Sequence, residues 1–581
     1  MVFNQMDKLS ISRRMESIEM TWDDLLYVLG ADESEMNAVF DMIKLVQKLS
    51  KVPIRIHQLP VEILVKTTNY LDSLDALKLS SCSKQLLPLR QHVFGNRRKL
   101  VLKAPVESIP RFIKDYTAAV DIIECYDENT FKQHYKWLKT FSNIRQLSIF
   151  YSKIFDLELL IKFIHVKKLH LKILEIKDLS AISKFKDLQD LGIEYMSDIN
   201  PSDISNTLDG SVFRNLANLR RLSIKNMIVP NTPVFSHLIQ LQELELTRTG
   251  FGGMANVSLL VNLVKLNITE RLFLGDIKEL KNLKKLKTLQ IKKSPFSGGE
   301  ALVHLTSLVR LEITGCGTSN ISFLSSLPSL NWLTLSENHI SNITPLQSLT
   351  NLEYLDLSVN GIEHVSVLSN LIKLKTLRLG ENKVRDISCL QNLVELTELK
   401  VDSNYVFNFS PLARLTKLEI LDCSKNDNQD CSALAGLVRL RQLYIFGNLL
   451  TCIEPLQNLR NLHTLHANNN EFHDISPLSQ MVELKELYLY GNHIWNVSAL
   501  SGLVKLETLH IDCNSIDDIT PFSRMISLRD LNIANNDIHC LLPLVGLPNL
   551  RTLEYRDNTL FDLNPLDILK QRNVQFIVSI C

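Results

Sequence analysis

The sequence has almost no net charge, because 64 lysine and arginine residues are balanced by 63 aspartate and glutamate residues. A formal charge of +1 gives no overall attraction to nucleic acid or to an acidic membrane. No apolar run approaches the roughly 20 residues that span a bilayer. Asp7, Lys8 and Arg13 interrupt the apolar residues near the N-terminus, where a signal peptide needs a continuous core. We therefore expect a protein of the cytoplasm or nucleus that binds neither nucleic acid nor membrane.

The ten cysteines form no CxxC pair and no cluster with the spacing of a metal site, which favours a reducing compartment. A glycine-rich phosphate loop and a paired-carboxylate segment are also missing, and the serine, histidine and aspartate residues are dispersed. The sequence thus predicts no metal, no cofactor and no enzymatic activity.

The strongest pattern is an asparagine that recurs every 22 residues. Leucines precede it in the pattern L-x-x-L-x-L-x-x-N, as in Leu352, Leu355, Leu357 and Asn360. Leucines two residues apart face one side of an extended strand. A buried asparagine after the strand can satisfy backbone groups that the turn leaves unpaired. The asparagines are Asn338, Asn360, Asn382, Asn404, Asn426, Asn448, Asn470, Asn492, Asn514, Asn536 and Asn558.

The pattern resembles the leucine-rich repeat family, in particular the internalin-like and phosphatase-regulator-like subclasses with 22-residue units. The frame continues upstream, where Cys316 and Ser294 replace the asparagine, and looser units end near Arg271, Thr249, Met227, Met196, Leu174 and Ser152. A longer step fits an insertion around Ser197 to Gly210. The resemblance implies an α/β solenoid, a horseshoe of about nineteen repeats with a parallel concave sheet and turns or 3₁₀ segments opposite.

We expect five regions along the chain. They are an N-terminal helical region (1–55), an F-box-like motif (56–100), a transition with irregular first repeats (101–140), the repeat solenoid (141–570) and a C-terminal cap strand (571–581). Caps are needed at both ends because a single repeat cannot bury its apolar face alone.

Residues 59–98 begin with Leu-Pro and continue with a Tyr-Leu pair and an Asp-x-Leu segment, at 70–71 and 75–77. This order resembles an F-box, whose three short helices dock on the adaptor subunit of a cullin-based ubiquitin ligase. Thr67 and Thr68 depart from the family, which usually has apolar residues there. The alternative is a helical cap. The resemblance implies these adaptor-contact residues: Leu59, Pro60, Ile63, Leu64, Leu71, Leu74 and Leu77.

Outward strand positions form the face that can bind a partner. Four consecutive repeats carry aromatic or histidine residues at these positions, and aromatic side chains are enriched at interface hot spots. Surface aromatics that bind nothing are the alternative. The predicted patch comprises Tyr444, Phe446, His466, Tyr488, Tyr490 and His510.

Charged outward residues are also unevenly spread. Basic residues such as Arg221, Lys225 and Arg310 project from earlier strands, whereas acidic residues such as Asp422 and Asp530 project from later ones. An uneven field can orient a partner, although an ordinary solvated face carries charge as well.

The combined hypothesis is a monomeric substrate-recognition subunit of an SCF-type ubiquitin ligase that holds a protein target on its concave face. One alternative is a scaffold or phosphatase-regulatory protein whose N-terminal helices only cap the solenoid. Another is an effector from a pathogen or symbiont with the same architecture.

Overall fold

The computed structural model describes the chain from Lys99 onward. The described residues are 99–102, 122–126, 138, 141, 143–152, 157–173, 179–196, 207, 210–229, 235–251, 254, 257–270 and 274–577. The chain divides into two compact units, Met1–Glu175 and Ile176–Cys581. The residues of the predicted F-box-like motif up to 98, and the predicted N-terminal helical region before them, lie outside the described part.

In the first unit, four parallel strands pair in sequence order. They are β1 (Lys99–Leu102), β2 (Ile122–Cys125), β3 (Gln146–Ser152) and β4 (Lys168–Ile173), with the 3₁₀ helix η5 (Leu157–Phe163) between the last two. Leu147 pairs with Leu169 and Ile149 with Leu171, and all four side chains are buried. Parallel strands therefore begin at Lys99, upstream of residue 141.

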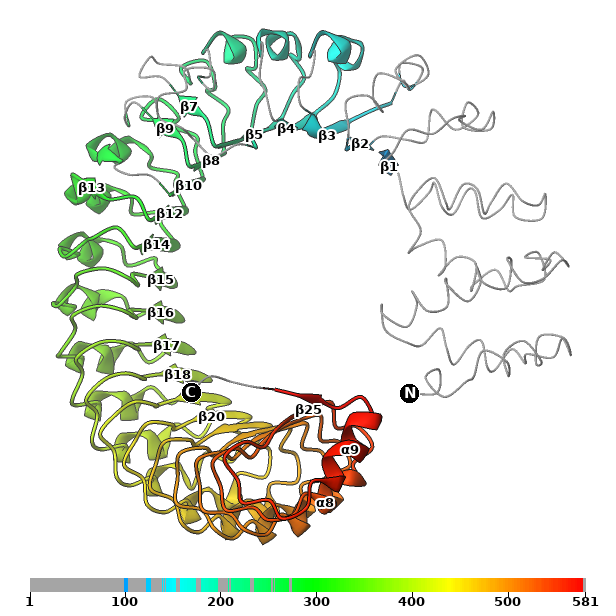
Figure 1. Cartoon of the computed structure of the whole chain (residues 1–581). Helices are drawn as coiled ribbons and strands as arrows, with labels where there is room; N and C mark the ends of the chain where they lie inside the picture. Colours follow the sequence, from blue (N-terminus) through cyan, green and yellow to red (C-terminus); the bar gives the residue numbers. More distant parts are fainter. Residues whose placement is uncertain are drawn as a thin grey trace, which may run out of the picture. The chain divides into compact units, whose positions relative to one another are not determined.

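The second unit is a solenoid in which each strand of its long sheet pairs in parallel with the next, β5 through β26. Figure 1 shows these strands on the inner side of the curve and the 3₁₀ segments on the outer side. Leu355, Leu377 and Leu399 pair in register, so that the leucines of successive repeats stack into one apolar core. The predicted leucine-rich repeat solenoid with a parallel concave sheet is confirmed.

The strands of the long sheet are β5 (Asp190–Tyr195), β6 (Arg221–Lys225), β8 (Glu243–Thr247), β10 (Lys265–Thr269), β12 (Thr288–Lys292), β14 (Arg310–Thr314), β15 (Trp332–Thr334), β16 (Tyr354–Asp356), β17 (Thr376–Arg378), β18 (Glu398–Lys400), β19 (Ile420–Asp422), β20 (Gln442–Tyr444), β21 (Thr464–His466), β22 (Glu486–Tyr488), β23 (Thr508–His510), β24 (Asp530–Asn532), β25 (Thr552–Glu554) and β26 (Gln575–Phe576). Two short parallel pairs lie outside it: β7 (Ile228–Val229) with β9 (Gly250–Phe251), and β11 (Gly275–Asp276) with β13 (Phe296–Ser297).

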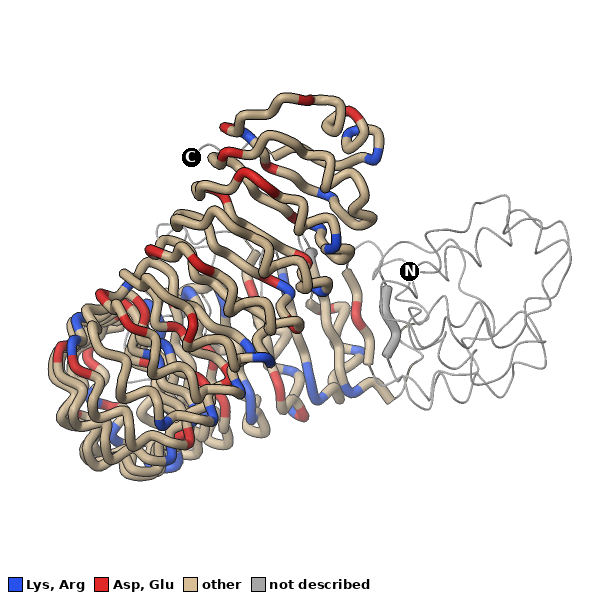
Figure 2. The backbone as a smooth tube through the Cα atoms, turned by 90° about the horizontal axis from the view of Figure 1, so that it is seen from below, with Lys and Arg blue, Asp and Glu red and all other residues tan. Residues whose placement is uncertain are grey.

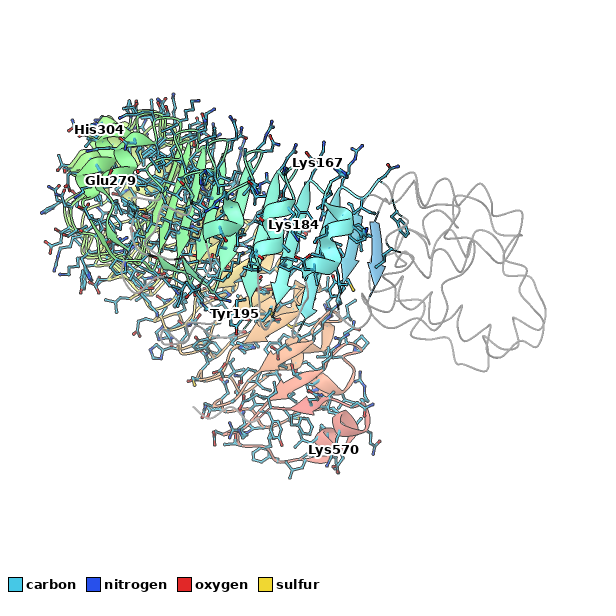
Figure 3. All side chains as sticks on the ribbon, turned by 90° about the horizontal axis from the view of Figure 1, so that it is seen from above. Lys167, Lys184, Tyr195, Glu279, His304 and Lys570 are labelled. Atoms are coloured by element: carbon cyan, nitrogen blue, oxygen red, sulfur yellow. The ribbon has the colours of Figure 1, made fainter. Side chains whose placement is uncertain are left out.

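Short 3₁₀ helices follow the strands, as the 22-residue unit predicts. They are η6 (Ser180–Lys184), η8 (Gly210–Phe213), η10 (Lys278–Asn282), η11 (Gly299–His304), η12 (Ser322–Ser326), η13 (Thr344–Ser348), η14 (Ser366–Asn370), η15 (Ser388–Asn392), η16 (Ser410–Arg414), η17 (Ser432–Leu434), η18 (Glu454–Asn458), η19 (Ser476–Gln480), η20 (Ser498–Gly502) and η21 (Thr520–Arg524), with α8 (Leu542–Val545) and α9 (Asn564–Gln571) in the last repeats. Glu279 and His304, labelled in Figure 3, belong to η10 and η11. Prolines such as Pro345 and Pro477 open these turns, where proline's fixed φ is favourable.

The upstream frame of the sequence is confirmed by the strand register. Leu289 pairs with Leu311 and Leu266 with Leu289, in the same 22-residue steps as the later repeats. Leu191 instead pairs with Leu222, so the longer repeat falls where the insertion is expected. At the other end, β26 pairs with β25 and adds a last strand to the sheet.

The recurring asparagines from Asn338 to Asn558, which we call the asparagine ladder, bond in the same way in every repeat. The Nδ2 group of Asn382 donates to the carbonyl oxygens of Leu379 and Leu357, both at 3.0 Å. Its Oδ1 accepts the backbone N–H of Ile362 at 3.0 Å. Because Leu357 and Ile362 belong to the preceding repeat, each asparagine joins two neighbouring repeats as well as closing its own turn.

The residue directly before each ladder asparagine has a positive φ. Gly447 and Gly491 adopt this conformation without a steric cost, but Val359 adopts it with φ 56°. A β-branched residue is unfavourable there, and the left-handed conformation costs about 1–2 kcal/mol. The turn therefore imposes a left-handed conformation on the residue before each ladder asparagine, whichever residue type stands there.

Candidate partner-binding face

Three outward positions per repeat form the concave face around β20–β23. In the repeat of β20 they are Gln442, Tyr444 and Phe446, with the buried leucine and isoleucine side chains between them. Parallel pairing in register places equivalent positions of neighbouring repeats side by side, about 4.8 Å apart. Residues 22 apart in the sequence therefore form rows that run across the strands.

One such row consists of Tyr444, His466, Tyr488 and His510, which we call the aromatic row. Its ring centroids are 4.8 Å apart for Tyr444–His466, 4.1 Å for His466–Tyr488 and 4.7 Å for Tyr488–His510. The rings are tilted or edge to face, which is the favoured arrangement of aromatic pairs. The row forms one continuous, half-buried surface on four strands.

Phe446 and Tyr490, the other two residues of the predicted patch, lie two residues after Tyr444 and Tyr488, on the same side of the sheet. The Lys425 ammonium lies 5.8 Å from the Phe446 ring centroid. Asn468, which occupies the repeat between them, is buried. The structure thus brings four of the six predicted residues into direct ring contact and places two beside them.

Burial, and to a smaller extent nearby carboxylates, perturb the titration of the aromatic row. Burial raises the pKa of Tyr444, and the nearby Glu486 and Asp422 carboxylates raise it further. Burial lowers the pKa of His466, against the opposing effect of Glu486 and Asp422. Burial therefore favours the neutral imidazole of His466, whereas the two carboxylates favour its protonated form.

The charges on earlier strands are paired across the sheet. Arg221 Nε lies 2.9 Å from a Glu243 carboxylate oxygen, and Lys225 Nζ lies 2.9 Å from Glu245. Lys292 similarly pairs with Glu312 at 2.6 Å. Both signs of charge are interspersed over the described residues (Figure 2). The basic outward residues named here are thus largely neutralised by their neighbours.

On later strands some carboxylates are paired, as Glu398 is with Arg378 at 2.8 Å, and others are not. Asp402, Asp422, Glu486 and Asp512 form no ion pair within the described residues. Asp422 accepts hydrogen bonds only from Ser424, at 3.2 Å from its backbone nitrogen and 2.6 Å from its hydroxyl. Asp530 lies 3.1 Å from His510 Nε2. Carboxylates without an ion pair therefore lie on strands of the aromatic row, as Glu486 does on β22, and on neighbouring strands, as Asp422 does on β19.

Asp402 is the most perturbed of these groups. Burial, and then the neighbouring Asp422 carboxylate, raise the pKa of Asp402 to about 6. Its carboxylate lies over Gly380, where an added Cβ would be 2.4 Å from Asp402 Oδ1. Glycine at this position therefore makes the room in which the carboxylate is partly buried.

The substitution Asp402→Asn should stabilise the fold at alkaline pH. Because the folded-state pKa is raised above the unfolded value of about 3.9, the stability that Asp402 contributes below pH 4 is lost as the pH rises through about 6. We expect D402N to raise the free energy of unfolding by about 1 kcal/mol at pH 8, after solvent screening, and to change it little at pH 4. Urea unfolding at both pH values measures this, with the exposed Asp517→Asn as control. Equal gains at both pH values would contradict it.

A second aromatic pair on the concave face was not singled out in the sequence. Trp332 and Tyr354, on β15 and β16, stack with centroids 3.6 Å apart and planes at 3°. The Arg310 guanidinium lies 4.3 Å from the Trp332 ring centroid, and that of Arg378 lies 5.7 Å from Tyr354. The sequence does indicate this pair, because two aromatic residues occupy equivalent outward positions 22 residues apart. Because the outer ring faces contact arginines, this pair offers less free aromatic surface than the aromatic row.

A surface pocket of about 320 Å³ lies on a flank of the solenoid, away from the outward strand positions, and is lined in part by Arg385, Phe407 and Pro411. Asp386 in its wall accepts hydrogen bonds from the backbone and hydroxyl of Ser388. Because Asp386 and Ser388 bond to each other within one turn, the pocket adds no cluster of functional side chains to the concave face.

Neither a metal site nor a membrane-spanning helix is present in the described residues. They contain no group of three or more histidine, cysteine, aspartate or glutamate residues arranged to hold a metal ion. None of their helices is long and apolar enough to cross a membrane. The predicted adaptor-contact residues Leu59 to Leu77 lie outside the described part of the chain.

Comparison with known proteins agrees with the fold. Residues 438–480 and 482–524 match a family model of leucine-rich repeats in two copies. The chain is a leucine-rich repeat protein. A search of curated proteins gave no match.

Solved structures of the same architecture include the leucine-rich repeat ectodomain of the Arabidopsis receptor kinase HAESA in complex with an IDA peptide hormone, at 20% identity and a TM-score of 0.55 over 73% of this chain and 72% of that one. The plant peptide hormone receptor RGFR1 in complex with RGF2 shares 18% identity, with a TM-score of 0.54 over 82% and 89%. An internalin of Listeria monocytogenes is 32% identical over 51% of this chain and 87% of its own, with a TM-score of 0.48.

Proposed function

We propose that the chain is a protein-binding module whose partner docks on the aromatic row and on the adjoining Phe446 and Tyr490. The observation that carries this proposal is the unbroken ring contact from Tyr444 to His510 on four neighbouring strands. Half-buried aromatic rings held by a rigid sheet lose little conformational freedom on binding, and aromatic residues are enriched in interface hot spots. The two plant receptors of the same fold were solved with peptide hormones, which is in keeping with a peptide or protein ligand.

Site-specific photocrosslinking tests the proposal. A benzophenone amino acid at Phe446 should crosslink a defined protein in a eukaryotic lysate. The same group at Phe407, an exposed aromatic residue off the concave face with 66% of its surface accessible, should not crosslink that protein. Crosslinks that are absent at Phe446, or identical at both positions, would argue against a binding site on the aromatic row.

We further propose that this module is the substrate-recognition subunit of a cullin-based ubiquitin ligase. The support is the resemblance of residues 59–98 to an F-box, which precedes the repeats in the order of F-box/leucine-rich-repeat proteins. In this assembly the F-box-like segment docks on the adaptor, the repeats hold the target and other subunits transfer ubiquitin. The chain itself then has no catalytic step to perform.

An affinity pull-down tests this assignment. The full chain should recover the cullin adaptor, and a variant with Leu59, Pro60 and Leu71 changed to alanine should not. A matched control changes three exposed valines to alanine, Val438, Val482 and Val504, and should retain the adaptor. If the adaptor is absent from the parent as well, the ligase assignment is wrong, and a scaffold or phosphatase-regulatory protein becomes the better hypothesis.

A further inference from the structure

Of the carboxylates that border the aromatic row, Asp422 and Glu486 form no ion pair within the described residues, whereas Asp530 pairs with His510 at 3.1 Å. Asp422 pairs in register with Tyr444 at one end of the row. Glu486 lies on β22, the strand of Tyr488, and Asp530 lies on β24, two strands further along. The one side-chain partner of Glu486 in the described structure is the Thr464 hydroxyl, at 3.3 Å. By contrast, Glu243, Glu245 and Glu312 all have arginine or lysine partners.

The tyrosines of this surface are affected both by burial and by the carboxylates. Burial raises the pKa of Tyr488, and Glu486 and Asp530 raise it further. The hydroxyls of Tyr444 and Tyr488 donate to no group within the described residues. Ring faces, free hydroxyls and carboxylates thus occur together, and each of these groups attracts a cation or an N–H donor.

We infer that the aromatic row and its bordering carboxylates bind an extended protein segment rich in lysine or arginine. This inference rests on the proposed function and names the chemistry of the partner. An uncharged or acidic segment would desolvate the carboxylates without pairing them, which is costly. Lysine and arginine supply the missing charges, and their apolar stems can cover the rings.

The geometry suits an extended chain that crosses the strands. The rings of the row follow one another at 4.1–4.8 Å. Side chains on one face of an extended peptide are about 6.6 Å apart, so that about three of them span the row from Tyr444 to His510. Lys400 pairs in register with Asp422, and the Lys425 ammonium lies 5.8 Å from the Phe446 ring, so both lysines lie at the Asp422 end of the row. The outward positions of β21 to β24 carry no lysine that would compete with the segment.

Fluorescence anisotropy with labelled peptides and the full chain tests the inference. The probe is a 12-residue peptide of alternating glycine and lysine, compared with its acetyl-lysine and glutamate counterparts. We expect the lysine peptide to bind, binding to weaken when sodium chloride rises from 50 to 300 mM, and the two counterparts to bind at least about tenfold more weakly.

Variants assign the binding to this surface. Changing Asp422→Asn, Glu486→Gln and Asp530→Asn together should weaken lysine-peptide binding roughly tenfold or more. The matched control Glu363→Gln, Glu454→Gln and Asp517→Asn removes the same charge from exposed positions off the concave face and should bind like the parent. Circular dichroism verifies that both variants are folded.

The inference fails if the lysine and glutamate peptides bind equally, or if the two triple variants bind the lysine peptide equally. Either result leaves the proposed function standing whenever the crosslink from Phe446 is still obtained, because that experiment does not depend on partner charge. Loss of the crosslink with retained lysine-peptide binding would instead reject the proposed protein partner and retain a site that binds cationic side chains.

Discussion

The substitution Asn382→Ala should lower the free energy of unfolding by about 3 kcal/mol. Asn382 is 7% exposed, and its amide bonds the carbonyls of Leu357 and Leu379 while its oxygen accepts the N–H of Ile362. Alanine leaves these backbone groups without partners in a turn that water does not reach. Each unsatisfied buried group costs about 1–3 kcal/mol, and partial relaxation reduces the sum.

Urea unfolding followed by circular dichroism measures this loss. Asn370→Ala is the matched control, because Asn370 is exposed in η14 of the neighbouring turn and should change stability by less than about 0.5 kcal/mol. If the two substitutions destabilise the chain equally, the asparagine ladder has no special role in stability. A change in the slope of the transition for Asn382→Ala would indicate that neighbouring repeats unfold separately.

Replacing Tyr444 and Tyr488 together with alanine should weaken binding of the partner crosslinked at Phe446 by about a hundredfold. Tyr444 contacts the His466 ring, and Tyr488 contacts the rings of His466 and His510. Removing both tyrosines therefore takes away apolar area and leaves the histidine rings unsupported. Hot-spot aromatic residues contribute about 2 kcal/mol or more, and a hundredfold change corresponds to about 3 kcal/mol.

The affinity is measured by surface plasmon resonance with the identified partner. The matched control replaces two exposed aromatic residues off the concave face, Phe407→Ala and Trp495→Ala, which are 66% and 61% exposed. Unchanged affinity in the Tyr444/Tyr488 variant, or an equal loss in the control, would show that the aromatic row is not the binding surface. Urea unfolding of both variants separates lost binding from lost folding.

The repeat frame could be predicted from the sequence because it depends on periodicity alone. Cys316 and Ser294 lack the asparagine amide, yet the leucines before them keep the register of their strands. The 3₁₀ segments on the convex side could also be predicted, from the length of the repeat unit and the position of its proline. These features are repeated many times, so the stacking of neighbours reinforces each local preference.

Side-chain partners on the concave face could be predicted only in part. Alternation assigns Tyr444 and His466 to the same face, but ring contact depends on rotamers that periodicity does not determine. Trp332 and Tyr354 fit the same rule, and only the structure shows that Arg310 and Arg378 lie over their rings. Similarly, the uneven charge was visible in the sequence, whereas the pairing of Lys292 with Glu312 was not.

The bonds of the asparagine ladder also determine how such a chain can change its length. Each asparagine reaches a carbonyl 25 residues back and an N–H 20 residues back, wherever it stands between Asn338 and Asn558. Removing or duplicating any 22-residue segment in this range therefore joins two chemically equivalent edges. Genetic loss or gain of whole units can widen or narrow the binding face while every junction keeps the same hydrogen bonds.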